Sequence, residues 1–158
     1  MIFTTKAEYG VRLLVELGRQ SEARPVSLKA IAEAEGLPLA YLERIVALLR
    51  KAELVESTRG AHGGYRLSRP AEDIRMDEAI LALEGSVAPM TCFVDDRGES
   101  AHGVLCSHEA DRGHGCATKL LWTRVQGGVF KALQQTTLAE LVAFHGRPVV
   151  AAREPVNA

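Results

Sequence analysis

Apolar side chains recur every three or four positions along much of this chain, which is the spacing of amphipathic helices. One region departs from that spacing, because short runs at residues 54–55 and 65–67 bracket the glycine-rich segment 59–64, as in a β-hairpin. The pattern therefore predicts a mainly α fold with one small β-hairpin. The predicted helices lie within residues 4–19, 27–37, 38–55, 75–83 and 117–135 and in a short stretch that begins at Thr137.

The two helices between residues 27 and 55 carry recognisable start and stop signals. Ser27 can cap the first helix, and Gly36 supplies the backbone freedom that a tight turn after a helix requires. Pro38 suits the first turn of the second helix, where its missing N–H is no loss. Helix, turn, helix and hairpin in this order form a winged helix-turn-helix, whose second helix fits the major groove of DNA. The pattern therefore favours DNA binding.

The chain divides into four parts on this interpretation. We expect a winged helix-turn-helix DNA-binding domain at residues 1–84 and a cysteine-bearing loop at 85–116. A long helix and a final short helix occupy residues 117–146, and residues 147–158 form a disordered tail. The long apolar-striped helix is expected to be the interface of a homodimer, because symmetric operators are read by symmetric dimers. The alternative is that this helix folds back on its own winged domain.

Charge and composition narrow the function further. Residues 1–70 carry 11 basic and 8 acidic side chains, whereas residues 71–158 carry 8 basic and 12 acidic ones. The positive half coincides with the helix-turn-helix, as contact with DNA phosphates requires. No apolar run approaches the roughly 20 residues of a membrane span and no signal peptide is recognisable, so a cytoplasmic protein without a membrane partner is expected.

Three cysteines are the candidate site for a metal or for redox chemistry. In a cytosolic protein, clustered thiols suggest metal binding or redox chemistry before structural disulfides. Thiolates suit iron–sulfur clusters and zinc, and His108 and His114 lie two positions from cysteines, as in zinc half-sites. The spacing alone leaves a cluster, zinc and free redox-active thiols open. The three residues are Cys92, Cys106 and Cys116.

An enzyme is not expected from this sequence. A small thiol or metal enzyme would need a motif that the chain lacks: a Cys-x-x-Cys pair, a His-Glu-x-x-His helix, or a glycine-rich phosphate loop after a strand. A protein-interaction module that uses the helix-turn-helix only as a scaffold is a further alternative.

From Thr4 to Leu141 the chain resembles the Rrf family of bacterial winged-helix, iron–sulfur-responsive regulators of the IscR and NsrR type. The resemblance rests on TTKAEYGVRLL, on PLAYLERIVALLRKAELVESTRGAHGGYRL, on the helix ending in LEG, and on CATKLLW and TTLAEL near the end. It implies a homodimer that carries a [2Fe–2S] or [4Fe–4S] cluster on Cys92, Cys106 and Cys116. It also implies that the state of the cluster decides which promoters are bound.

The cysteine region departs from the family pattern in two ways. The intervals between the cysteines, thirteen and nine residues, are longer than in the family motif. Lys119 occupies the position at which IscR-type relatives have a ligating histidine, and a protonated amine cannot ligate. The candidates for the fourth ligand are Glu8 of the partner chain, which resembles the NsrR-type arrangement, and His108 or His114 of the loop itself.

The resemblance also implies a set of DNA contacts. Tyr41, Glu43 and their neighbours would face the major groove, where Glu43 can accept a hydrogen bond from a cytosine amino group. Arg59 would enter the minor groove from the hairpin, and the alternative for Glu43 is a solvated helix face. The expected DNA-binding residues are Ser27, Pro38, Ala40, Tyr41, Glu43, Arg44, Arg50, Arg59, Gly60 and His62.

The resulting functional hypothesis is a homodimeric transcriptional repressor that binds a double-stranded operator. Its expected signal is the status of an iron–sulfur cluster, the redox state or nitric oxide, sensed through the three cysteines. The alternative is a winged-helix regulator without a cluster, whose signal is zinc, thiol oxidation or a protein partner.

Overall fold

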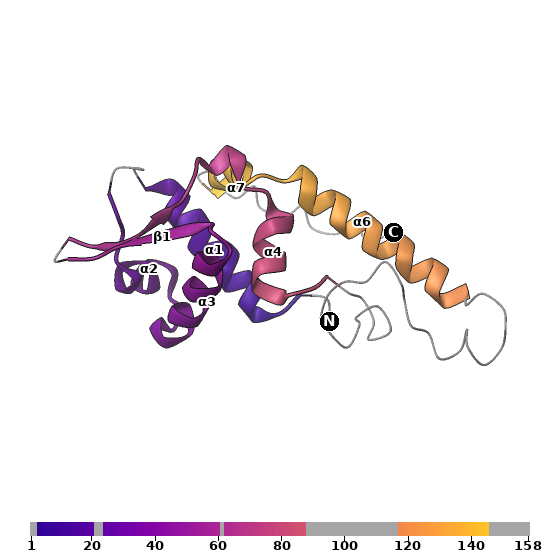
Figure 1. The fold of residues 1–158 in the computed structure, drawn as a ribbon, viewed down its shortest axis with the longest axis horizontal. Coiled ribbons are helices and arrows are strands. Elements are labelled where there is room, and N and C mark those ends of the chain that lie inside the picture. The colour runs from indigo at the N-terminus through magenta and orange to yellow at the C-terminus, as the bar shows by residue number, and fades with distance from the viewer. Residues whose placement is uncertain (1–2, 21–23, 61, 88–116, 146–158) are drawn as a thin grey trace, which may run out of the picture.

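The computed structural model describes residues 3–20, 24–60, 62–87 and 117–145, which form a helical body with a hairpin at one end and a long helix at the other (Figure 1). The mainly α architecture with a two-stranded hairpin confirms the predicted fold class. The elements are α1 (Thr5–Arg19), α2 (Leu28–Glu35), α3 (Leu39–Lys51), β1 (Val55–Thr58), β2 (Gly64–Leu67), the 3₁₀ turn η1 (Ala71–Asp73), α4 (Met76–Glu84), α6 (Ala117–Gln135) and α7 (Leu138–His145).

The helix boundaries follow from side chains that cap them. The Ser27 hydroxyl accepts a hydrogen bond from the backbone N–H of Ala30, which confirms its role at the start of α2. Gly36 ends that helix in the left-handed region, at φ 63° and ψ 36°, where a side chain would be strained. Pro38 lies one position earlier than predicted, since it is the N-cap of α3 and Leu39 is the first helical residue.

The hairpin is antiparallel and is attached to the segment before α2. Val55 pairs with Leu67 and Thr58 with Gly64, so Arg59 and Gly60 lie at the tip, directly after β1. The backbone N–H and C=O of Tyr65 also bond to Val26, both at 2.8 Å, which ties β2 to the strand-like residues ahead of Ser27. This bridge orients the hairpin relative to α2.

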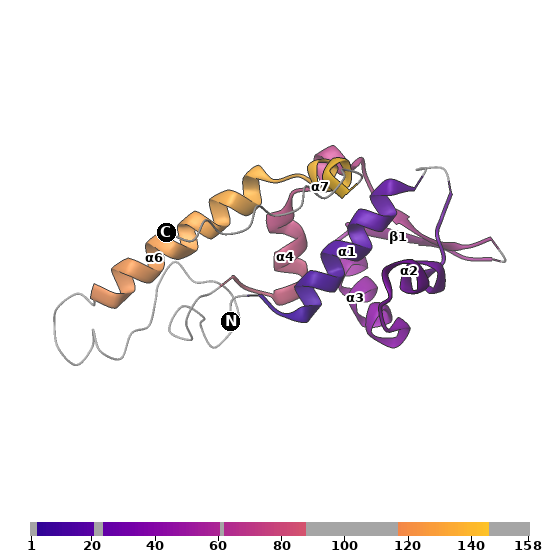
Figure 2. The same ribbon diagram turned by 180° about the vertical axis from the view of Figure 1, so that it is seen from behind.

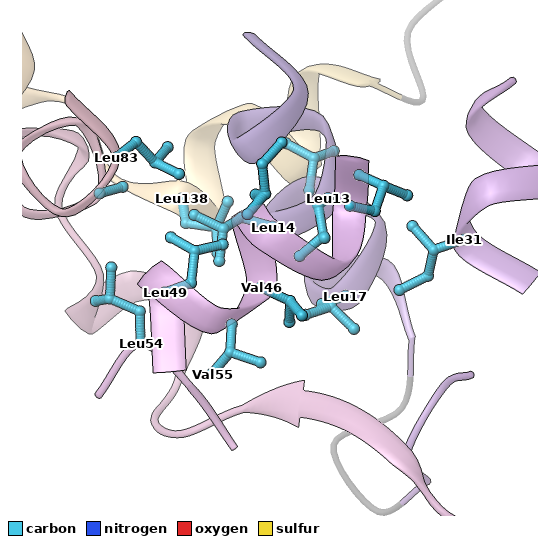
Figure 3. Packing of buried hydrophobic residues seen from close by; sticks show 14 of the residues in the cluster. Leu13, Leu14, Leu17, Ile31, Val46, Leu49, Leu54, Val55, Leu83 and Leu138 are labelled. Atoms are coloured by element: carbon cyan, nitrogen blue, oxygen red, sulfur yellow. The ribbon is translucent and has the colours of Figure 1, made fainter. Parts of the chain in front are cut away.

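The core of the body lies between α1, α3 and α4. Leu13 and Leu14 of α1 and Leu42 and Leu49 of α3 are fully buried in one hydrophobic cluster, part of which Figure 3 shows from close by. Each fully buried leucine stabilises the fold by roughly 1.5–3 kcal/mol relative to an exposed one. Helices α1 and α4 approach closely at Gly10, where an added Cβ would overlap the side chain of Leu83.

The last helix, α7, returns to the body although it follows α6 in the chain. The backbone of residues 136–138 bonds to that of residues 74–76, including Leu138 N–H to Ile74 O at 2.8 Å. Leu138 is fully buried in the main core cluster. Thr137 and Glu140 form a capping box at the start of α7: Thr137 N–H donates to Glu140 Oε2 at 2.8 Å, and Glu140 N–H donates to Thr137 Oγ1 at 3.3 Å.

Helix α6 extends away from the body, which Figure 2 shows from behind. Within the described residues, its second half packs on the body, where Val129, Phe130 and Leu133 lie against the cluster that includes Ile80. None of its 19 residues is buried. Leu120 and Leu121 in its first half are 58% and 55% exposed. Among the described helices, none has the length and apolar content of a membrane span.

Candidate nucleic-acid interface and cysteine segment

Helix α3 has two contrasting faces. One face is buried and follows the helical spacing of its apolar residues, Leu42, Ile45, Val46 and Leu49. A second stripe at helical spacing is exposed. It consists of Ala40, Glu43, Arg44 and Ala47.

The predicted DNA-contacting side chains of α3 and of the hairpin make few contacts with the rest of the described residues. Within the described residues, the side chains of Glu43, Arg44, Arg50 and Arg59 form no hydrogen bond or ion pair. The other predicted contact residues are exposed too, except Tyr41, which is half-buried. The exposed ones are Ser27, Pro38, Ala40, Glu43, Arg44, Arg50, Arg59, Gly60 and His62.

Tyr41 is held by α1. Its ring meets that of Tyr9 edge to face, with centroids 5.7 Å apart and an interplanar angle of 89°. Beside this pair lies an open concavity of about 560 Å³, formed by the start of α1 and the start of α3. It brings Thr5 and Tyr9 next to the predicted contact residues Pro38, Ala40, Tyr41 and Arg44.

The sequence interpretation missed this contribution of α1. Spacing alone places Tyr9 with Leu13 and Leu17 on the core face of its helix, and nothing in the periodicity of residues 4–19 indicates that its ring contacts α3. The arrangement depends on how α1 crosses α3, which is a tertiary contact.

The hairpin carries the second group of predicted contacts. Arg59 and Gly60 lie at its exposed tip, beyond the body at the end of the molecule away from α6 (Figure 1). A shallow concavity of about 690 Å³ joins the hairpin to the start of α2, and Ser27 and His62 both line it. Arg24 lines the same concavity and was not predicted, because it lies outside both motif helices.

Most of the candidate cluster ligands lie outside the described residues: Cys92, Cys106, Cys116, His108 and His114. Within the part of the chain that the structure describes, no group of three or more histidine, cysteine, aspartate or glutamate side chains is placed to hold a metal.

Glu8 is the one candidate ligand that the structure describes. It is exposed in the first turn of α1, and its carboxylate forms no hydrogen bond or ion pair with a described residue. Its neighbour Ala7 packs against Val87, the last described residue before the cysteine segment.

Several contacts hold the entrance to that segment in place. Val87 is 1% exposed, and its carbonyl accepts a hydrogen bond from Gln126 Nε2 of α6 at 3.0 Å. At the end of α4, Glu84 Oε1 accepts hydrogen bonds from Thr4 Oγ1 at 2.6 Å and from Thr4 N–H at 3.2 Å. The start of α1, the end of α4 and α6 therefore meet where the cysteine segment begins.

Comparison with known proteins agrees with this geometry. Residues 3–144 match the Rrf2 family, described as an iron-dependent transcriptional regulator. The chain is 35% identical to the protein rrf2 of Nitratidesulfovibrio vulgaris over 90% of its own length and 87% of that protein. Its relatives and structural neighbours are transcriptional regulators, not enzymes.

Two solved structures have a similar fold. The structure of CymR, the global cysteine regulator of B. subtilis, has a TM-score of 0.72 and 33% identity, and the match covers 91% of this chain and 98% of CymR. That of T. potens IscR has a TM-score of 0.70 and 34% identity, covering 92% and 88% of the two chains.

Proposed function

Because the chain belongs to the Rrf2 family of transcriptional regulators, we propose that it is a homodimeric, cytoplasmic repressor whose binding to a double-stranded operator depends on an iron–sulfur cluster. The DNA-binding part of this proposal rests on one observation. The exposed face of α3 lies uncovered beside a hairpin that carries Arg59 at its tip. A helix presented in this way suits the major groove, and an arginine at a hairpin tip suits the minor groove.

Substitution of the tip arginine tests the DNA-binding surface. Arg59→Ala should weaken binding to DNA from upstream of the protein's own gene at fixed salt, with little change in melting temperature, because Arg59 is exposed and makes no described contact. Lys131→Ala on α6 removes the same charge far from the hairpin and is the matched control. Equal weakening by both variants, measured by fluorescence polarisation, would leave the hairpin without a specific role.

The proposal of a homodimer rests on α6. A stripe of apolar side chains without burial is unusual for a 19-residue helix, and a second copy would cover it. Gly127 and Gly128 lie inside this helix, where each costs roughly 1 kcal/mol relative to alanine. An added Cβ at either position would meet nothing within 4 Å in this chain, so no described contact requires these glycines. Close approach of a partner helix would explain them.

The cysteine segment supplies donors that suit an iron–sulfur cluster. Three thiols can hold such a cluster together with one further ligand. Glu8 suits that fourth position by its exposure in the first turn of α1 and by its lack of a described partner. We propose that Glu8 ligates across the dimer, with His108 or His114 of the same segment as the alternatives. When bound, the cluster would supply an oxidisable centre that oxygen or nitric oxide can destroy.

Coupling between the segment and DNA would pass through the helices at its entrance. A cluster that orders the Cys92–Cys116 segment against α4 and α6 would change the spacing of the two α3 helices in the dimer. A coupling free energy of about 1–3 kcal/mol would change DNA affinity about 5- to 150-fold.

Cysteine substitution tests the sensing part. Cys92→Ala, Cys106→Ala and Cys116→Ala should each abolish the visible absorbance and the iron and sulfide content of protein purified without oxygen. Circular dichroism should remain that of the folded protein, since the described core contains none of the three. A triple variant with full iron and sulfide content would contradict the proposal.

A second candidate keeps DNA binding and drops the cluster. A relative of 33% identity is the global cysteine regulator of B. subtilis, so members of this fold family differ in their signals. Lys119 in place of the ligating histidine of IscR-type relatives also favours a different signal. Zinc, thiol oxidation or a protein partner would then take the place of the cluster. Colourless protein that cannot be reconstituted with iron and sulfide would support this candidate.

A further inference from the structure

The exposed stripe of α3 combines two long charged side chains with small ones, and this combination limits which DNA bases it can contact. Glu43 and Arg44 are its only long side chains, and alanines flank them at positions 40 and 47. Small residues let a helix axis lie close to the floor of a groove, so two long side chains between them can reach base edges. We propose that Arg44 reads a guanine in each half-site, next to the cytosine that Glu43 accepts from. This inference rests on the proposed operator binding.

The hydrogen-bonding geometry of the Arg44 guanidinium favours guanine over the other three bases. In the major groove a guanidinium forms two parallel hydrogen bonds to guanine O6 and N7, a pattern that no other base offers. Arg44 is exposed, forms no hydrogen bond or ion pair with a described residue, and borders the open concavity at the start of α3. Its guanidinium therefore breaks no described interaction of the protein when it binds DNA.

The position of Arg44 distinguishes it from the other arginine of the helix. Residues in the first part of a recognition helix contact base edges, and Arg44 is in the first half of α3. Arg50 lies in the last turn, where a basic side chain suits the helix C-terminus and contact with a phosphate. Arg44 should therefore contribute to specificity and Arg50 to affinity.

Glu43 and Arg44 should read different base pairs. Consecutive helical residues point about 100° apart around the axis, so their side chains diverge. In addition, the structure shows no ion pair between these two neighbours. A carboxylate that accepts from cytosine N4 and a guanidinium that donates to guanine then define two separate positions of the half-site.

Selection from a DNA library tests this directly. The full-length protein, purified without oxygen, is used to enrich duplexes from a library with a randomised core, and the motif is compared with those of two variants. Arg44→Gln should replace guanine by adenine at one position of each half-site, because a glutamine amide pairs with adenine N6 and N7. Wild-type protein should prefer guanine there about 5- to 150-fold, and Arg44→Lys should keep guanine with a smaller preference.

Arg50→Gln is the matched control. It removes the same charge from the same helix and should weaken binding to all sequences without changing the motif. A guanine that Arg44→Gln retains, or uniform weakening by that variant, would overturn the role of Arg44 while leaving operator binding intact. Wild-type protein that enriches no motif, with or without a reconstituted cluster, would overturn the proposed function itself.

Discussion

The body of the molecule and helix α6 both have apolar side chains at helical spacing, but these side chains are buried to very different extents. In the body, the apolar stripes of α1 and α3 are buried, with Leu13, Leu14, Leu42 and Leu49 all at 0% exposure. Helix α6 also has apolar residues at helical spacing, yet none of its residues is buried within the chain. Among the described residues, the apolar surface of α6 is covered only near its C-terminal end.

This difference shows that an amphipathic pattern predicts an apolar helix face but does not predict which surface covers that face. Burial of apolar area drives packing in either case, because the driving force is not directional. In the body the partner surfaces belong to one chain and are joined by short loops. The first half of α6 projects past the body, and within the described residues no other element packs against it.

The largest expected effect comes from the centre of the body. Leu14→Ala should lower the free energy of unfolding by about 2–5 kcal/mol, because the side chain is fully buried and its loss leaves a cavity. Urea denaturation followed by circular dichroism measures this. The loss should be the same at all protein concentrations. A loss that vanishes on dilution would place Leu14 in an interface between chains.

The close approach of α1 and α4 gives the next largest effect. Gly10→Ala should cost about 1–3 kcal/mol, because the new methyl group overlaps Leu83. Leu83→Val in the same protein should recover part of this loss by making room, which a double-mutant cycle would show as coupling. Strictly additive losses would mean that the two helices do not meet at this point.

The return of α7 to the body predicts a smaller effect. Thr137→Ala should destabilise the body by about 1 kcal/mol, because the capping box loses the hydroxyl that accepts from Glu140 N–H. Thr137→Ser keeps the hydroxyl and serves as the control. If thermal unfolding leaves the two variants indistinguishable, the cap does not contribute to the stability of the body.

The smallest effect on the free energy of unfolding is expected in the first half of α6. Leu121→Ser should change the stability of the body by no more than about 0.5 kcal/mol, since this side chain is 55% exposed. The same substitution should shift the protein from dimer to monomer in sedimentation experiments. Thr123→Ser, on an exposed residue of the same helix, should leave the dimer unchanged. A wild-type protein that sediments as a monomer would remove the proposed role of α6.

Much of the fold could be predicted from the chain because the signals are local. The capping serine, the left-handed glycine after α2, the hairpin around residues 59–63 and the capping box of α7 all follow from neighbouring residues. The face of α3 that is buried also follows from spacing alone, and so does the exposure of Glu43 and Arg44 on the other face.

The candidate site was only partly predictable because some of its members come from distant elements. Thr5 and Tyr9 border the concavity beside Arg44 only because α1 crosses the start of α3. Arg24 joins Ser27 and His62 only because β2 bridges to Val26. The spacing of apolar residues along the sequence does not predict such tertiary contacts.

The sequence by itself determined the elements, their caps and their apolar faces, since each depends on residues a few positions apart. Tertiary structure alone decided that residues 136–138 bond to residues 74–76, so that α7 completes a core formed by the first half of the chain. It also decided that Leu120 and Leu121 in the first half of α6 are more than half exposed. The physical reason is that burial of an apolar face is favourable against any complementary surface, because the hydrophobic effect is not directional. Only the path of the whole chain determines which surfaces meet.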